Sequence, residues 1–476
     1  MKFKKNKMLK STSPALLLVL LLAINVNAQF TKCNDYNDTD AINSSLCTSV
    51  KVPLNHKESD NDSIEIFIRK FPALKKRAGS IWLISGGPGE SGASLYPLIT
   101  LFSETFPHLD IYIPDHRGTG LSGKICPKEE SVDSPNGIAL ANDEWGSCFN
   151  HMYTNTPYVQ AFSITNAAKD LSFLINDLSG SGKRYVYGVS YGTQLIMRLL
   201  QLDNTSLDGV ILDSFVPLQD DTNYDLSHRS FIVNEVGNSV LKRFDTLISQ
   251  DDNSLTSQLK SIIEKSKTEP DFAEKLPKQE LSILFGMMLD IPKVRNKIPL
   301  IIDALNHENV EPLNDALKEI EEFYKDYGNN YKSSPSSIPL VQIISSSENN
   351  LRPTLKPKEI VAESENLLFT SILPKIMADN AMPTYQKDNY FANVPKSMPP
   401  TLILHGTLDP KTPLSGAINH FNKLPKDNPL NLIKIKDAPH FIALFAPESF
   451  SSLASKFVNG KPIKSTIIND KDTLLK

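Results

Sequence analysis

The stretch Gly188-Val189-Ser190-Tyr191-Gly192 constrains this chain more than any other, because of what stands on either side of it. An apolar, β-rich run precedes it at residues 185–187, and a helical pattern follows over residues 193–202. A strand that turns directly into a helix makes so tight a turn that its central residue needs glycine on both sides. The turn pushes the hydroxyl of Ser190 out of the sheet and predicts a serine nucleophile. The five letters alone would also fit an ordinary Gly-rich turn, so the flanking strand and helix carry the prediction.

Short apolar runs predict the strands of a parallel sheet. Continuous runs of β-forming residues suit strands that are covered on both faces, and five occur, at residues 81–84, 111–113, 185–187, 210–212 and 402–404. Residues 64–68 alternate instead and predict a half-buried strand. A helical pattern runs over residues 165–178, with Thr165 as its expected N-cap. Alternating strands and helices indicate an α/β fold with a mostly parallel, doubly wound sheet.

A change in the pattern divides the chain. From about residue 219 to about residue 394 helical segments dominate, for example at residues 231–248, and the strand signal returns only at Thr401. We therefore expect a core in two parts, residues 29–218 and 395–476, with a helical cap, residues 219–394, inserted between them. A chain of 476 residues is long enough for one large domain with such an insertion.

The first 28 residues are typical of a processing segment. A basic start is followed by an apolar run at residues 15–24 and by small residues up to Ala28. That run is shorter than the roughly 20 residues needed to span a bilayer. We predict a cleaved signal peptide, residues 1–28, with an uncleaved signal anchor as the alternative. The protein should then be secreted and extracellular, with lysosomal and periplasmic locations left open, and without stable membrane insertion after cleavage. A formal net charge of -4 gives no electrostatic case for binding nucleic acid.

An exported chain with an even number of cysteines is expected to form disulfides. Pairing of neighbours, Cys33 with Cys47 and Cys126 with Cys148, closes the shortest loops, although two other connectivities stay open. The sequence has no Cys-x-x-Cys motif and no Cys/His cluster, so neither a metal nor a cofactor is expected. Four Asn-x-Ser/Thr sequons would be glycosylated in a eukaryotic source, at Asn37, Asn43, Asn61 and Asn204.

A serine hydroxyl needs a neighbouring base to become a good nucleophile. In hydrolases built on such a strand–turn–helix, the order along the chain is serine, acid, histidine. His440 is the last histidine and follows a strand-like run at residues 432–435, and Asp409 follows the last predicted central strand. We therefore predict a catalytic triad of Ser190, Asp409 and His440. Asp213, one strand earlier, is the competing acid.

A loop rich in glycine is expected to complete the oxyanion hole, which needs two backbone N–H donors. One donor should be Tyr191, directly after the nucleophile. The other should come from residues 85–92, where Pro88 has no N–H, so that Gly87 is favoured and Gly89 is second. The alternative is a phosphate-binding loop, but the Gly-Lys-Ser/Thr ending of a P-loop is missing.

Other polar residues near these motifs are expected to be structural. Asp115 and Arg117, in the loop that follows the strand at residues 111–113, should tie neighbouring loops together. His405 should make a structural hydrogen bond at the end of its strand, and His420 should lie on a solvated helix surface.

Four motifs in order resemble those of a known family. They are Ser85-Gly-Gly-Pro-Gly, Asp115-x-Arg117-Gly-x-Gly-x-Ser122, Gly188-x-Ser190-Tyr-Gly192 and Asp409-Pro-x-Thr-Pro413. The combination is similar to the α/β-hydrolase serine peptidases that include prolyl iminopeptidases and secreted tripeptidyl aminopeptidases. It implies an α/β-hydrolase fold with a helical cap insertion. There are two departures: Ser85 replaces the usual His of prolyl iminopeptidases, and the cap lacks the cysteines of the tripeptidyl type.

The resemblance implies a secreted serine exopeptidase that removes short N-terminal residues or peptides from substrates with a free N-terminus. Such an enzyme must recognise an α-amino group, for which a carboxylate is a suitable partner. Asp379, late in the cap where family members carry an acidic residue, is favoured; Glu235 is also proposed, and Glu363 and Glu365 are further candidates. A secreted esterase or lipase would share the triad but have an apolar pocket without this carboxylate. A non-catalytic binding protein on the same fold is the other alternative, and the oligomeric state is left open.

Overall fold

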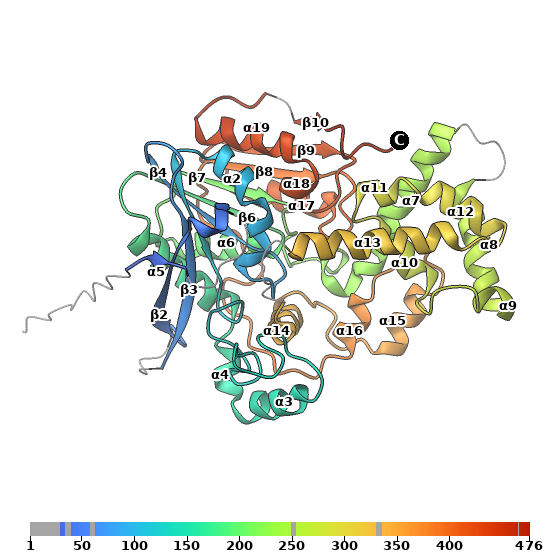
Figure 1. The fold of residues 1–476 in the computed structure, drawn as a ribbon, viewed down its shortest axis with the longest axis horizontal. Helices are drawn as coiled ribbons and strands as arrows, with labels where there is room; N and C mark the ends of the chain where they lie inside the picture. The colour runs from blue at the N-terminus through green and yellow to red at the C-terminus, as the bar shows by residue number, and fades with distance from the viewer. Residues whose placement is uncertain (1–28, 34–39, 58–61, 249–253, 330–335, 465) are drawn as a thin grey trace, which may run out of the picture.

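The fold is built on one mixed β-sheet (Figure 1). The computed structural model describes residues 29–33, 40–57, 62–248, 254–329, 336–464 and 466–476. Within them the strand order is β1-β2-β3-β5-β4-β6-β7-β8-β9-β10. The strands are β1 Thr31–Lys32, β2 Leu46–Pro53, β3 Ser63–Phe71, β4 Gly79–Ile84, β5 Leu109–Pro114, β6 Lys183–Val189, β7 Gly209–Asp213, β8 Thr401–Gly406, β9 Leu430–Lys436 and β10 Ile467–Asn469. The expected signal peptide, residues 1–28, lies outside the described residues.

The sheet is parallel from β5 through β10 and antiparallel at its other edge. Every neighbouring pair from β5 to β10 is parallel, whereas β1, β2, β3 and β5 are joined antiparallel. The predicted mostly parallel α/β sheet is thereby confirmed, and each of the six predicted runs lies in one of the strands β3 to β8. The sequence did not predict β2, because it mixes polar residues and lysine with its few apolar ones.

Helices cover both faces of the sheet and bury two cores. In chain order the core helices are α1 Asp40–Asn43, η1 Gly92–Leu98, α2 Ile99–Thr105, α3 Glu144–Thr154, α4 Thr156–Gln160, α5 Ile164–Leu178, α6 Tyr191–Leu202, α17 Leu414–Lys423, α18 Ile442–Phe445 and α19 Pro447–Val458. α5 and α6 pack on the face that carries Trp82. α2 and α19 pack on the opposite face, where Phe102 and Phe450 meet the ring of Tyr187 edge-on. β4, β5, β7 and β8 are buried along their whole length, as continuous apolar runs predict.

The start of α5 differs from the prediction. Its N-cap is Ser163, whose side chain accepts a hydrogen bond from the backbone N–H of Asn166 at 3.3 Å. The predicted N-cap Thr165 is wrong, because this residue lies inside the helix and donates its hydroxyl to Asp388 at 2.6 Å. Ser163 and Thr165 both have a hydroxyl close to the start of the apolar pattern. The sequence therefore allows either as the N-cap, and tertiary contacts decide between them.

Between β7 and β8 the described residues form helices and connecting loops, with no strand. The helices are η2 Thr222–Tyr224, η3 Leu226–His228, α7 Arg229–Ile248, α8 Leu255–Thr268, α9 Pro270–Ala273, α10 Leu281–Met288, α11 Pro292–Arg295, α12 Ile298–Asn306, α13 Glu311–Asn329, α14 Ile338–Glu348, α15 Pro357–Ser364 and α16 Leu373–Ala378. α7 to α13 gather to one side of the sheet (Figure 1) around an apolar core of their own. These helices fall within the expected cap, residues 219–394, whose boundaries stay a prediction.

Both disulfides join neighbouring cysteines. Cys33 pairs with Cys47 and Cys126 pairs with Cys148, which confirms the favoured connectivity. In the part of the chain that the structure describes, no helix combines the length and the apolar character needed to cross a membrane.

The sequons differ in accessibility. Asn204 is exposed just beyond α6, and Asn43 is half-buried at the end of α1. Asn37 and Asn61 lie outside the described residues. Glycosylation therefore stays a prediction for all four asparagines, and Asn204 is the most accessible described acceptor.

A buried ion pair joins the inserted helices to the core. Arg198 of α6 donates to Glu348 of α14 at 2.7 Å, and the two side chains are only 5% and 3% exposed. The hydroxyl of Tyr385 donates to the other oxygen of Glu348 at 3.0 Å. Removing Glu348 would leave the buried Arg198 with only the longer ionic contact to Asp388, at 3.7 Å, which is more costly than losing an exposed pair.

We expect Glu348→Ala to lower the free energy of unfolding by about 3 kcal/mol, because Arg198 stays buried and keeps only the longer ionic contact to Asp388. Urea denaturation followed by circular dichroism would measure the change. The matched control is Glu448→Ala, which removes an exposed pair with Lys471 and should leave the midpoint unchanged. Equal midpoints for the two variants would contradict the role of the buried pair.

Candidate active site

Ser190 lies at the turn between β6 and α6 in a strained backbone conformation. Its φ of 54° and ψ of -125° fall outside the regions that residues other than glycine usually occupy. Gly192 makes the turn sterically feasible, since a Cβ there would lie 2.5 Å from the carbonyl oxygen of Ile84 in β4. The start of α6 therefore packs directly against the sheet, as the strand–turn–helix pattern predicts.

Two further strand ends bring His440 and Asp409 together. Asp409 follows β8 and His440 follows β9. Nδ1 of His440 lies 2.9 Å from Oδ2 of Asp409. With Nδ1 engaged, Nε2 is the nitrogen left to serve Ser190. His440 lines the same cavity as Ser190, so the structure brings all three predicted triad residues to one site.

Asp409 is held in place as an ionised acceptor. Its Oδ1 accepts the backbone N–H groups of Lys411 and Thr412, each at 2.8 Å. Its Oδ2 accepts the hydroxyl of Thr412 at 2.6 Å as well as His440. Burial opposes ionisation, but the charge of His440 and these hydrogen bonds hold the pKa of Asp409 well below its usual range. An ionised Asp409 orients His440 with its proton on Nδ1.

Asp213, the competing acid, has a different set of partners. It accepts the backbone N–H groups of Ile442 at 2.8 Å and of Ala443 at 2.9 Å, together with the hydroxyl of Tyr187 at 3.0 Å. Ile442 begins α18, directly after the turn that carries His440. Asp213 therefore anchors the backbone beyond His440, whereas Asp409 contacts the ring itself.

The Gly-rich loop approaches Ser190 from β4. Gly87 has a φ of 110°, and a Cβ there would lie 2.3 Å from the backbone nitrogen of Gly89, so a side chain is excluded. Among the described residues, the N–H of Gly87 has no hydrogen-bond acceptor. Tyr191 is the first residue of α6, so its N–H has no acceptor within the helix. Gly87 and Tyr191 line a small cavity together with Ser190, an arrangement that suits the predicted pair of oxyanion donors.

A cavity of about 470 Å³ opens beside Ser190, between the core and the inserted helices. From the core it is lined by the Gly-rich loop, Ser190 and His440, and from the insertion by residues of α7, α13 and α14. Its volume lies within the range of small-molecule sites, about 300 to 1,000 Å³. Most of the other lining residues are apolar, among them Pro97, Val341 and Phe445.

Among the described residues, four charged side chains besides His440 line this cavity: Glu90, Arg229, Asp290 and Lys411. Asp290 and Lys411 form an ion pair at 3.0 Å. Glu90 and Arg229 have no such partner among the described residues. Burial raises the pKa of Glu90, against the opposing charges of Lys411 and His440. The described part of the chain contains no group of three or more His, Cys, Asp or Glu side chains placed to hold a metal ion.

The structure does not bring the expected amine-binding residues to Ser190. Asp379, at the end of α16, and Glu235, on α7, are both exposed and do not line the cavity. Glu363 is held by Arg352 at 2.8 Å. Sequence reasoning missed Glu90, although one signal was present: it is the only charged residue in a loop of small residues directly after Gly-Gly-Pro-Gly.

Asp115 and Arg117 are structural, as predicted. Arg117 is buried and donates to both oxygens of Asp170, each at 2.7 Å. Asp115 accepts the backbone N–H groups of Gly92 and Leu121, each at 2.8 Å. The loop after β5 is thereby fastened to the Gly-rich loop on one side and to α5 on the other.

The structure confirms the prediction for one of the two other histidines near the site and contradicts it for the other. The structural role of His405 is confirmed: it is buried, Nδ1 accepts the N–H of Phe215 at 3.0 Å, and Nε2 lies 2.8 Å from the carbonyl of Thr412. The predicted solvated surface role of His420 is wrong. Its ring is only 4% exposed and stacks on Phe215 at 4.3 Å, because α17 turns this side chain toward the segment after β7. Burial lowers the pKa of His420 to about 4.

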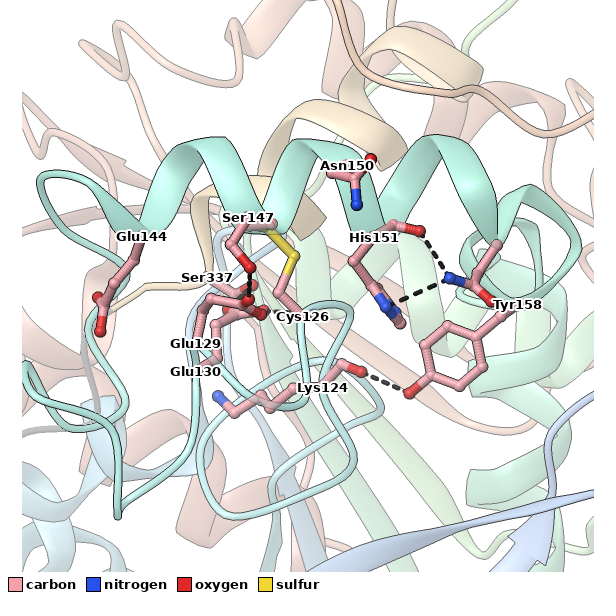
Figure 2. The surroundings of a disulfide bond; sticks show 12 residues. Lys124, Cys126, Glu129, Glu130, Glu144, Ser147, Asn150, His151, Tyr158 and Ser337 are labelled. Atoms are coloured by element: carbon pink, nitrogen blue, oxygen red, sulfur yellow. Dashed lines mark hydrogen bonds between the residues drawn. A yellow bond between two sulfur atoms is a disulfide. The ribbon is translucent and has the colours of Figure 1, made fainter.

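The disulfide between Cys126 and Cys148 lies close to Glu130 and Ser337 (Figure 2). Hydrogen bonds connect these two residues to the Gly-rich loop. Glu130 accepts the backbone N–H of Cys126 at 3.0 Å with one oxygen and the hydroxyl of Ser337 at 2.7 Å with the other. The backbone N–H of Ser337 donates to the carbonyl of Gly89 at 3.0 Å. Because the bond from Cys126 to Cys148 closes the segment that carries Glu130, it supports this loop from outside the cavity.

A parallel sheet with Ser, Asp and His at the ends of separate strands is the architecture of the α/β hydrolases. The model of the family described as the alpha/beta hydrolase fold matches residues 79–447, and the chain belongs to this family. The serine protease Hip1 of Mycobacterium tuberculosis and Mycobacterium bovis is 29% identical over 186 residues, 35% of this chain and 35% of that protein. YuaR, a hydrolase by its description, from Escherichia coli K12, is 26% identical over 191 residues, 37% of each chain. The chain thus matches little more than a third of the length of these relatives.

Solved structures are similar only at the level of the fold. A proline iminopeptidase from Mycobacterium smegmatis has a TM-score of 0.38 at 13% identity, covering 87% of this chain and 98% of that chain. An epoxide hydrolase from an endophytic Streptomyces has a TM-score of 0.39 at 12% identity, covering 89% and 99%. Values this low say nothing about a shared substrate.

The two acids should differ on substitution. We expect Asp409→Asn to lower the turnover of an activated ester such as p-nitrophenyl acetate by up to about 10⁴-fold, because His440 loses the partner that sets its tautomer. Asp213→Asn should mainly lower the thermal midpoint, because an amide cannot accept from both Ile442 and Ala443. A larger loss of turnover in Asp213→Asn than in Asp409→Asn would reverse the assignment.

The two disulfides form a matched pair for a second test. Removing either, as Cys126→Ser with Cys148→Ser or as Cys33→Ser with Cys47→Ser, should lower the free energy of unfolding by about 3 kcal/mol, given loops of 22 and 14 residues. Only loss of the Cys126–Cys148 disulfide should also slow labelling of Ser190 by a fluorophosphonate, because only this disulfide supports the Gly-rich loop. The labelling rate of each folded variant is the readout, and equal rates would refute the connection.

Proposed function

We propose that the protein is a secreted serine aminopeptidase that removes short N-terminal pieces from peptides with a free N-terminus. The observation that carries the proposal is the hydrogen bond from His440 to Asp409, 2.9 Å long, in the cavity that also contains Ser190 on its strained turn. That arrangement fits a serine activated by a base whose orientation is set by an acid.

The reaction would follow the usual acyl-enzyme course. Ser190 Oγ attacks the scissile carbonyl carbon while Nε2 of His440 takes the hydroxyl proton. The oxyanion would receive hydrogen bonds from the N–H groups of Gly87 and Tyr191. His440 then gives its proton to the leaving amine, and the peptide C–N bond breaks. A water molecule, deprotonated by His440, attacks the acyl-enzyme; the acid product leaves and Ser190 regains its proton.

Recognition of a free amine falls to Glu90 in this proposal. A Cβ at Gly86 would lie 3.2 Å from Cβ of Ser190 and 3.4 Å from Oε2 of Glu90, so one methyl group would bridge the two side chains. Each further residue of an extended chain adds roughly 3.3–3.6 Å between amine and scissile bond. The position of Glu90 therefore favours the amine of the residue next to the scissile bond, and a product of one residue rather than three.

The comparisons support a peptidase to a limited extent. Hip1 is described as a serine protease, but the match covers about a third of each chain. An esterase, the alternative, would have an apolar pocket with no carboxylate to bind an amine. The largely apolar lining of this cavity is compatible with an esterase, and the presence of Glu90 favours the peptidase. A non-catalytic binding protein would not be expected to keep all three triad residues.

The compartment is part of the proposal. Two disulfides fit an oxidising environment, as in secreted proteins. Together with the predicted signal peptide, residues 1–28, they support secretion into an extracellular, lysosomal or periplasmic space.

The test uses coumarin-linked aminoacyl and tripeptidyl substrates, each with a free and with an acetylated N-terminus. We expect cleavage of the free forms only, with aminoacyl substrates preferred. Glu90→Gln should reduce the preference for the free amine by about 10-fold or more, because a charge-assisted hydrogen bond is lost. The preference should be full above the raised pKa of Glu90 and decline below it, since the protonated carboxyl has no charge to offer the amine.

Asp379→Asn and Glu235→Gln are matched controls, because both remove exposed carboxylates outside the cavity. Neither should change the preference. Equal cleavage of free and acetylated substrates by the wild type would sink the aminopeptidase proposal, and a lost preference in Asp379→Asn alone would move amine recognition away from Glu90.

A further inference from the structure

Among the described residues, Arg229 is a buried cation of the active-site cavity with no ion-pair partner. It is the first residue of α7 and is 8% exposed. Its Nε is buried without a hydrogen bond, and within the described ranges its guanidinium forms no hydrogen bond or ion pair. A buried charge without compensation is costly, so such a group is rare unless a ligand completes it.

The three carboxylates whose negative charges act on Arg229 already have other partners. Asp409 accepts from His440 and from backbone N–H groups, and Asp290 pairs with Lys411. Asp225 accepts the hydroxyl of Ser227 at 2.8 Å and also binds a backbone N–H. Burial, only partly offset by these three carboxylates, lowers the pKa of Arg229 to about 10, so the side chain is still a cation at neutral pH.

Arg229 also lies where a substrate must pass. It lines the main cavity with Glu90, Ser190 and His440. It also lines the smaller cavity with Gly87 and Tyr191, the proposed oxyanion donors. Since both cavities contain Ser190 as well as Arg229, one short substrate can reach the nucleophile and the guanidinium together.

We propose that Arg229 binds a carboxylate of the substrate, so that the enzyme selects short peptides with a free amine and an anionic group close to the scissile bond. This inference rests on the proposed function and narrows its substrate class. Among the described charged side chains of the cavity, Asp290 and Lys411 form an ion pair, whereas Glu90 and Arg229 form none and have opposite signs. Arg is suited to the role because its planar guanidinium can bind a carboxylate through two parallel hydrogen bonds.

The carboxylate could be the C-terminus of a dipeptide or an acidic side chain, and four substrates separate these sources. They share the best-cleaved first residue, followed by Ala with a free carboxylate, Ala-amide, Glu-amide or Gln-amide. Ala is compared with Ala-amide, and Glu-amide with Gln-amide. In at least one of these pairs we expect kcat/KM to be at least about 10-fold higher for the substrate that carries the carboxylate. Arg229→Gln should abolish that ratio while the neutral member changes less, and Arg229→Lys should retain part of it.

Arg184→Gln is the matched control and should keep the wild-type ratio, because this half-buried arginine of β6 donates to Asn176 at 3.4 Å and does not line the cavity. Thermal midpoints of all variants establish that they are folded. No preference for an acid in the wild type, or a preference that survives in Arg229→Gln, would overturn the inference.

A binding measurement separates this inference from the proposed function. Titration calorimetry of the Ser190→Ala variant measures binding without turnover. Phe-Ala is compared with Phe-Ala-amide, and Phe-Glu-amide is compared with Phe-Gln-amide. Tighter binding of an acid that disappears when Arg229→Gln is added supports the anion site even if no peptide is hydrolysed. In the opposite case, the wild type hydrolyses peptides while Ser190→Ala binds acids and amides equally well. That result would support the aminopeptidase proposal and reject the anion site.

Discussion

The close packing of α6 against β4 behind Ser190 is the constraint on which the rest of the site depends. Because Gly192 has no side chain, the first turn of the helix lies against the carbonyl oxygen of Ile84. This contact holds Ser190 at a positive φ and presents the free N–H of Tyr191 on the same side. The Gly-rich loop leaves β4 at this point, so one contact places both the nucleophile and the proposed oxyanion donors.

Two buried carboxylates at neighbouring strand ends show how environment divides chemical roles. Asp409 faces His440, which holds its pKa low and keeps it ionised. Asp213 is equally buried, and burial raises its pKa against the backbone N–H groups that it accepts. One acid therefore orients the histidine ring, while the other fixes the turn on which that ring is carried.

The inserted helices are part of the site, because they close the cavity above Ser190 and supply half of its charge. Arg229 and Asp290 come from the insertion, and Glu90 and Lys411 come from the core. The ion pair between Asp290 and Lys411 ties the two parts together directly beside the catalytic residues. In the proposed function, substrate selection is therefore a property of the boundary between core and insertion.

The sequence alone determined the central strands, the serine turn and the chain order that singles out Asp409 and His440, because these depend on local periodicity and on motifs a few residues long. It also pointed to the disulfide pairs, since short loops close most readily. Only the tertiary structure decided which charges line the cavity: it left Asp379 on the surface and placed Glu90 in the same cavity as Arg229, 139 positions away in the chain. It also buried His420, which the helical pattern had assigned to solvent. The physical reason is that exposure and pairing of a charge depend on elements distant in sequence, and no local pattern encodes which of them will meet.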